Sequence, residues 1–140
     1  MGRNYEMISS LFINKSQFDR ALRALQALNL KNNYRHMQGD YSKCSTFPEI
    51  LNEMEFHTDT YSEGRGIHIV GYEGSTEAID DVQPVIEAIV PFLDFGHRSR
   101  QSVDWNEERY SDEMSETDDS DYDEEPFMEN VASYCYTKPE

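Results

Sequence analysis

Cysteines, basic residues and long apolar runs are all scarce in this sequence. Its 140 residues include two cysteines, Cys44 and Cys135, and their separation matches no metal-binding or redox motif. We therefore expect two reduced thiols rather than a disulfide. No window approaches the roughly 18 apolar residues of a membrane-spanning helix, and residues 1–12 lack the apolar stretch of a secretory signal. These absences predict a soluble protein of the cytoplasm, or of the host cytoplasm if its source is viral.

Motifs of catalysis and cofactor binding are also missing. The segment from Gly71 to Gly74 (GYEG) lacks the spacing of a dinucleotide-binding loop. No serine or cysteine lies in a known nucleophile motif. We therefore expect that the protein is not an enzyme and that it binds neither a metal nor a cofactor. The histidines are expected to have structural roles; they are His36, His57, His68 and His97.

Aromatic residues, by contrast, are plentiful, with nine Tyr, seven Phe and one Trp. Disordered chains are poor in aromatic residues, and 140 residues is the usual size of one domain. Apolar residues make up 37%, which is below the ~45–50% of an average globular domain. The composition predicts a single domain, residues 1–140, that carries a highly charged surface or segment.

The order of the expected elements predicts the fold class. Apolar residues spaced by three and four predict helices over residues 17–29 and from position 80 or 81 to about 93, and Thr46 caps a short helix over 47–54. Runs rich in β-branched and aromatic residues predict strands at residues 5–13, 56–61, 66–72, 95–105 and 127–137. This order is typical of an α+β, ferredoxin-like two-layer sandwich, with two main helices on one face of an antiparallel sheet. A two-layer sandwich with another strand order is the alternative.

Charge is strongly segregated along the chain. The sequence has 28 Asp or Glu against 12 Lys or Arg, a net charge of −16. Residues 1–45 carry seven bases and three acids, whereas residues 104–140 carry two bases and fourteen acids. Phosphates repel carboxylates, so direct binding to nucleic acid or to an anionic membrane is not expected. The segregation instead favours a basic protein as the partner.

The densest acidic stretch is residues 104–125 (DWNEERYSDEMSETDDSDYDEE), which contains twelve acids and one base, Arg109. Most of it forms a predicted insertion at about 106–126, between the last two strands. A solvated loop that aids solubility is one interpretation. Imitation of a nucleic-acid backbone is another, because B-DNA has one charge per ~1.7 Å and an extended chain advances ~3.3 Å per residue.

Two further interpretations of this stretch have weaker support. Asp119, Asp121 and Asp123 match the first ligand positions of an EF-hand calcium loop. The glycine of that loop is replaced by Glu124, and its closing glutamate by Asn130. Phosphorylation by acidophilic kinases would deepen the negative charge, and its candidate sites are Ser115, Thr117 and Ser120.

If the stretch binds a partner, acids and aromatic anchors are expected to act together, because charge alone gives little specificity. The predicted partner-binding residues are Asp112, Glu113, Glu116, Asp118, Asp119, Asp121, Asp123, Glu124, Glu125, Trp105, Tyr110 and Tyr122.

In size, acidity and the stretch at 104–125, the chain resembles the small phage-encoded DNA mimics that block restriction or CRISPR nucleases. The resemblance lies in overall character and in no contiguous motif. It implies an inhibitor or decoy of the anti-restriction or anti-CRISPR type, which occupies the basic, nucleic-acid-binding surface of a partner.

Two other functions are kept open. The first is a non-catalytic structural or regulatory adaptor that binds through the exposed face of its sheet, with the acidic stretch as a solvated spacer. Its predicted apolar groove is lined by Tyr72, Tyr134 and Tyr136. The second is a small enzyme of unfamiliar type.

Overall fold

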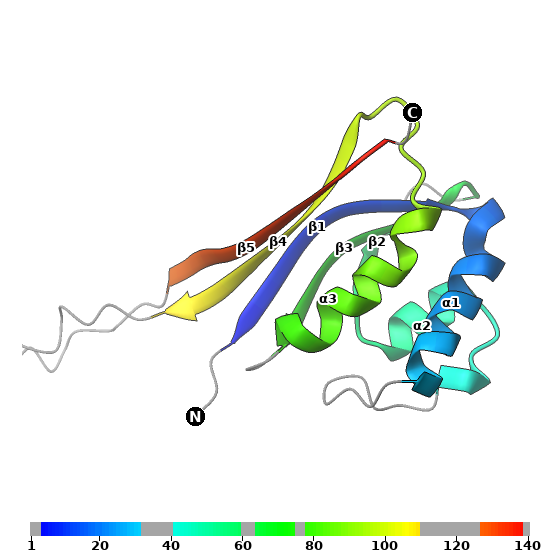
Figure 1. Cartoon of the computed structure of the whole chain (residues 1–140), viewed down its shortest axis with the longest axis horizontal. Helices are drawn as coiled ribbons and strands as arrows, with labels where there is room; N and C mark the ends of the chain where they lie inside the picture. Colours follow the sequence, from blue (N-terminus) through cyan, green and yellow to red (C-terminus); the bar gives the residue numbers. More distant parts are fainter. Residues whose placement is uncertain (1–3, 32–40, 60–63, 75–77, 110–126, 139–140) are drawn as a thin grey trace, which may run out of the picture.

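The computed structural model describes residues 4–31, 41–59, 64–74, 78–109 and 127–138. These residues form an α+β fold with a five-stranded antiparallel sheet in the order β2-β3-β1-β4-β5 (Figure 1). The strands are β1 (Tyr5–Asn14), β2 (His57–Asp59), β3 (Gly66–Gly74), β4 (Arg100–Arg109) and β5 (Phe127–Thr137). The α-helices of the described residues are α1 (Phe18–Lys31), α2 (Phe47–Glu53) and α3 (Ala78–Ile89).

The helices lie close to their predicted positions. The predicted cap of α2 is confirmed, because Thr46 Oγ1 accepts a hydrogen bond from the Glu49 amide at 3.2 Å. The helix α3 begins earlier than predicted, and its last turn continues as a 3₁₀ turn over Val90–Phe92. Pro91 lies in that turn, where its missing N–H disfavours a further α-helical turn. Across the described residues, every helix is too short or too polar to cross a lipid bilayer.

One continuous core contains residues from all three helices and from the central strands. Alternate residues of the strands point into it, as expected for a sheet with one buried face. Its largest fully buried side chains are Trp105, Phe47, Met7, Leu11, Ile13, Leu25, Ile50, Leu51, Ile69, Ile86 and Ile89.

The opposite face of the sheet, which we call the open face, carries exposed apolar residues. Ile8 on β1 is 51% exposed and Val70 on β3 is 39% exposed. Residues directly opposite each other in a sheet share a face, so Asp104, the β4 partner of Ile8, also lies here.

The backbone ladder between β1 and β4 ends at the middle of β1. It runs over Tyr5–Ser9, and side chains replace it beyond that point. The Ser102 amide donates to Ser10 Oγ at 3.1 Å, and the Phe12 amide donates to Gln101 Oε1 at 2.9 Å. The start of β4 is thus attached to β1 through side chains.

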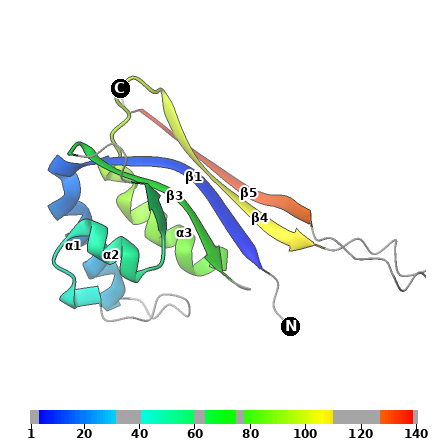
Figure 2. The same cartoon turned by 180° about the vertical axis from the view of Figure 1, so that it is seen from behind.

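The strands β4 and β5 form a long hairpin, paired from Arg100–Thr137 to Arg109–Phe127. We call this hairpin the arm. Both views show its far half extending beyond the helices (Figures 1 and 2). The predicted last strand, residues 127–137, is confirmed. The predicted insertion began too early, because residues 106–109 belong to β4; the segment that joins the two strands, 110–126, lies outside the described residues.

Candidate partner-binding surface

Most of the predicted partner-binding residues lie outside the part of the chain that the structure describes. All of the predicted contacts except Trp105 fall within residues 110–126, and so do the candidate phosphorylation sites and the aspartates of the calcium interpretation. What the structure determines is where this segment is attached. Arg109 and Phe127 are cross-strand partners, so the segment begins and ends at the tip of the arm.

Trp105 does not belong to a partner-binding surface. Its side chain is 0% exposed. Its indole N–H donates to Gln83 Oε1 of α3 at 2.9 Å, and its ring contacts Tyr72 edge-on with 6.4 Å between centroids. The alternation along β4 turns this residue toward the helices, and a partner cannot reach it. The prediction of Trp105 as a surface anchor is corrected to a core role.

The three tyrosines of the predicted adaptor groove also face the helices. Tyr72 is buried, and burial, with Glu55 as the next cause, raises its pKa to about 12. Tyr136 donates from its hydroxyl to Glu87 Oε2 on α3 at 2.5 Å. Burial, followed by this hydrogen bond, raises the pKa of Tyr136. Tyr134 packs against the same core, so the predicted groove on the exposed face is not formed by these residues.

Acidic residues gather at the end of the sheet nearest the tip of the arm, which we call the arm end. Glu6 on β1 lies directly opposite Glu73 on β3. Like charges in such a pair destabilise a sheet. The ion pair that Glu73 makes within the described residues is with His57 Nε2, at 3.9 Å, and it requires a protonated histidine. Glu108 on β4 belongs to the same end, where it accepts a hydrogen bond from Asn4 Nδ2 at 3.0 Å.

Arg109 is the one Lys or Arg between positions 101 and 137, and its charge is shared between two glutamates of the arm. Its terminal nitrogen lies 2.6 Å from Glu107 Oε1, and its Nε lies 2.5 Å from Glu129 Oε1. The Nε contact has the length of an ion pair but not the alignment of a hydrogen bond. Glu107 also accepts from the Tyr5 hydroxyl at 2.9 Å. Arg109 therefore neutralises the arm itself, at the point where residues 110–126 begin.

Exposed apolar residues accompany these acids on β5. Phe127 is 48% exposed and Met128 is 42% exposed. The strand is at the edge of the sheet described by the structure, and an unpaired edge can bind another chain. Apolar side chains beside a charged rim are typical of protein interfaces.

Sequence reasoning missed the contribution of Glu6 and Glu73 to this acidic end. The two residues are far apart in the chain, and only the pairing of β1 with β3 brings them together. The alternation of Glu6 and Ile8 with buried Met7 was the available signal, because it places acidic and apolar side chains on one face.

Within the described ranges, no three His, Cys, Asp or Glu side chains come together in a geometry that would hold a metal ion. The two cysteines of the chain form no disulfide; Cys44 is buried and Cys135 is exposed. Comparisons of the chain with protein-family models, with curated proteins and with solved structures found no match.

Proposed function

We propose that this chain is an acidic inhibitor or decoy that binds a basic, nucleic-acid-binding surface of a partner protein, such as a nuclease of the cytoplasm. The observation that supports this most is the pairing of Arg109 with Phe127 at the tip of the arm. The segment 110–126, which contains nine acids and no Lys or Arg, is therefore joined to the fold at that tip.

The electrostatics of the arm end favour the same function. Glu6, Glu73 and Glu108 extend the negative charge from the arm onto the sheet. A concentrated field of one sign speeds association with an oppositely charged partner and makes it sensitive to salt. The exposed side chains of Phe127 and Met128 supply apolar contacts once the charges have brought the partner close.

Competition with DNA follows from this arrangement. A groove that binds a nucleic-acid backbone is lined by Lys and Arg. Carboxylates of this chain that pair with those Lys and Arg side chains would keep the phosphates of the nucleic acid off the same surface. Inhibition of this kind needs no catalysis and no cofactor.

We also infer that the fold is a ferredoxin-like sandwich extended by one strand. In support, β2-β3-β1-β4 is the strand order of a split β-α-β arrangement, with α1 following β1 and α3 following β3. The single core shared by these helices and the strands supports their packing on one face. In this interpretation β5 is the added strand.

A second candidate function is a non-catalytic adaptor that binds through the open face of the sheet. It is favoured by the exposure of Ile8 and Val70 and does not depend on residues 110–126. Raised salt would hardly weaken this binding, and removal of residues 114–125 would leave it intact.

Charge-neutralising variants distinguish the two functions. In the test variant, Asp118, Asp119 and Asp121 become Asn. The control variant removes the same charge from the exposed body residues Asp19, Glu53 and Asp80. Each protein is used to capture partners from host lysate at low and high salt, with and without duplex DNA as competitor.

The inhibitor function predicts a captured nucleic-acid-binding protein that duplex DNA or high salt displaces. The test variant should lose it and the control variant should keep it, while circular dichroism shows both folded. Equal capture by the test variant and the wild type would reject the proposal, and capture that resists salt would favour the adaptor.

A further inference from the structure

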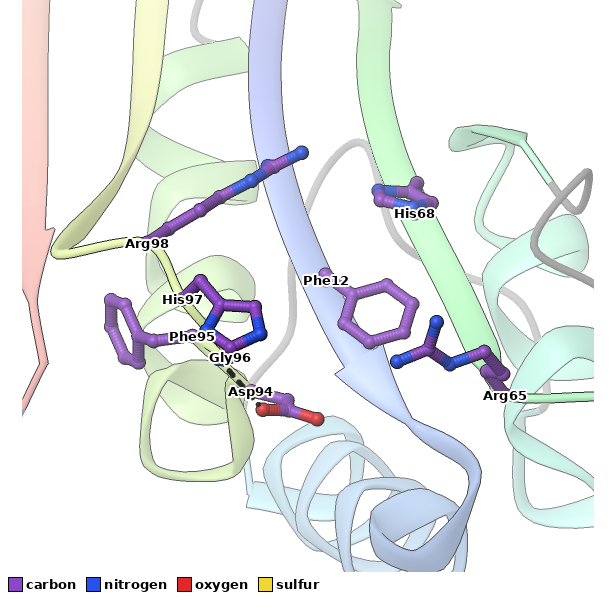
Figure 3. A pocket seen from close by; sticks show the side chains of 8 residues that line it. All are labelled: Phe12, Arg65, His68, Asp94, Phe95, Gly96, His97 and Arg98. Carbon is purple, nitrogen blue, oxygen red and sulfur yellow. Dashed lines mark hydrogen bonds between the residues drawn. The ribbon is translucent and has the colours of Figure 1, made fainter.

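A pocket of about 290 Å³ lies at the C-terminal end of β1, beside the base of the arm and away from its tip (Figure 3). Its walls come from the end of β1, the start of β3 and the turn before β4. Its side chains are aromatic and cationic, in contrast with the rest of this acidic chain, and the principal ones are Phe12, Arg65, His68, Asp94, His97 and Arg98.

The Phe12 ring forms an ordered apolar platform in this pocket. Its centroid is 4.6 Å from that of His68, which lies directly opposite on β3. The ring also lies over Gly66, where an added Cβ would be 2.7 Å from Phe12 Cζ. The Phe12 backbone is held on both sides, by Gln101 Oε1 at 2.9 Å and by the Asp94 amide at 2.8 Å.

The turn that carries Arg98 is fixed by hydrogen bonds. The Arg98 amide donates to the Phe95 carbonyl at 2.8 Å, and the Gly96 amide donates to Asp94 Oδ1 at 3.0 Å. The second carboxylate oxygen of Asp94 accepts from Asn14 Nδ2 at 3.2 Å. Both oxygens of the acid that lines this pocket are thus engaged by the protein's own donors.

The two arginines of the pocket make no ion pair within the described part of the chain. Arg65 extends from the start of β3 toward the Phe12 ring, and Arg98 extends from its turn across β1 toward His68 (Figure 3). Burial, and then the charge of Arg98, lowers the pKa of His68, against an opposing effect of Asp59. The pocket is therefore a positive site inside a negative molecule.

We propose that this pocket binds a small phosphorylated ligand with a planar ring, of the nucleoside monophosphate class. Two guanidinium groups that approach from different sides suit a phosphate, which presents three oxygens, better than a carboxylate with two. The Phe12 ring offers a stacking surface for a base, as aromatic residues do in nucleotide-binding proteins. The volume is at the small end of ligand pockets, which span about 300–1,000 Å³.

The ligand is a free mononucleotide rather than the end of a nucleic-acid strand. The net charge of −16 repels an anion in proportion to the charge that the anion carries. A single phosphate meets little of this repulsion, whereas a polynucleotide meets it along its length. The proposal does not depend on the inhibitor function, because the pocket lies beside the base of the arm, whereas residues 110–126 are joined to its tip.

Calorimetric titration of the full chain with AMP tests this assignment, with adenosine, inorganic phosphate and a 5′-phosphorylated hexanucleotide as comparisons. We expect saturable AMP binding at one site, weaker binding of phosphate and none of adenosine. Arg65→Gln and Arg98→Gln should each weaken AMP binding about tenfold or more. The control is Arg23→Gln, an exposed residue of α1 that changes the net charge equally.

Phe12→Leu tests the stacking role separately, because it should weaken AMP binding and leave phosphate binding unchanged. As an independent readout, AMP should raise the pKa of His68 in a nuclear magnetic resonance titration. The proposal is overturned by absent AMP binding, by equal binding of AMP and phosphate, or by tighter binding of the hexanucleotide. Equal losses in Arg23→Gln and in the two pocket variants would also overturn it, since net charge alone would then account for binding.

Discussion

The indole N–H of Trp105 donates a hydrogen bond of 2.9 Å to Oε1 of Gln83 in the buried core. The amide nitrogen of the same glutamine donates to the Tyr136 hydroxyl at 2.7 Å and to Glu87 Oε2 at 2.8 Å. One side chain of α3 therefore connects that helix to both strands of the arm. The base of the arm is held by polar contacts in the core, while its tip extends beyond the helices (Figure 2).

Substitution of Gln83 by Leu should lower the free energy of unfolding by about 2 kcal/mol, because it leaves the buried indole N–H without an acceptor. Urea denaturation measures the change. In a Trp105→Phe background the same substitution should cost less, since no donor is then orphaned. A double-mutant cycle should give a coupling of about 1 kcal/mol. Additive effects would show that the hydrogen bond contributes nothing of its own.

Gly66→Ala should destabilise the protein by about 2 kcal/mol or more through overpacking. The new Cβ would lie 2.2 Å from the Ile13 carbonyl oxygen and 2.7 Å from Phe12 Cζ. Gly64→Ala is the matched control. Gly64 has φ +84° with nothing within 4 Å of the added Cβ. Its replacement by Ala should therefore cost only about 1 kcal/mol of backbone strain. Thermal or urea unfolding that ranks the two variants in the opposite order would contradict the packing seen at Gly66.

Arg98→Gln should raise the pKa of His68 toward its ordinary value, because it removes the positive charge that acts with burial to lower that pKa. The change is measured from the imidazole resonances. Arg65→Gln serves as the control, since burial and Arg98 are the causes of the lowering.

His68 also makes the stability of the fold depend on pH in a defined direction. The unfolded chain takes up a proton near pH 6.5, whereas folded His68, with its lowered pKa, takes it up only at lower pH. Stability should therefore fall as the pH drops from 6.5 toward the folded pKa. Arg98→Gln should flatten this dependence, and an unchanged slope would count against the assignment.

Glu6→Gln should stabilise the protein by about 0.5 kcal/mol, because it removes repulsion from the directly opposite Glu73. The gain should shrink at high salt, since exposed charges are screened. Glu53→Gln on α2 is the comparison, an exposed acid outside the acidic end. If both substitutions have the same effect at low salt, the pairing of Glu6 with Glu73 carries no special cost.

Local patterns predicted the elements of the fold well. The apolar stripe of α1, the Thr46 cap of α2 and both ends of β5 were all expected from residues close together in the chain. The start of β4 was expected at residue 95, but the strand begins at Arg100. The carboxylate of Asp94 bonds the Gly96 amide there and holds residues 94–98 in a turn, which apolar alternation does not reveal.

The candidate site was predictable only in its charge. The acidic stretch was evident from composition, whereas the burial of Trp105 was not. Alternation puts Val103 and Trp105 on one side of a strand, but it does not say which side faces the helices. No sequence pattern indicated the cationic pocket, because Arg65 and Arg98 come from segments separated by a helix.

The amino-acid sequence by itself determined the secondary-structure elements and the segregation of charge, since spacing, capping and composition are properties of short segments. Tertiary structure alone decided that Trp105 is buried, that Glu6 lies opposite Glu73, and that Arg65 and Arg98 share a pocket. These relationships depend on strand order and register, which join distant segments. A shift of one residue in register exchanges the two faces of a strand, and no local pattern carries that information.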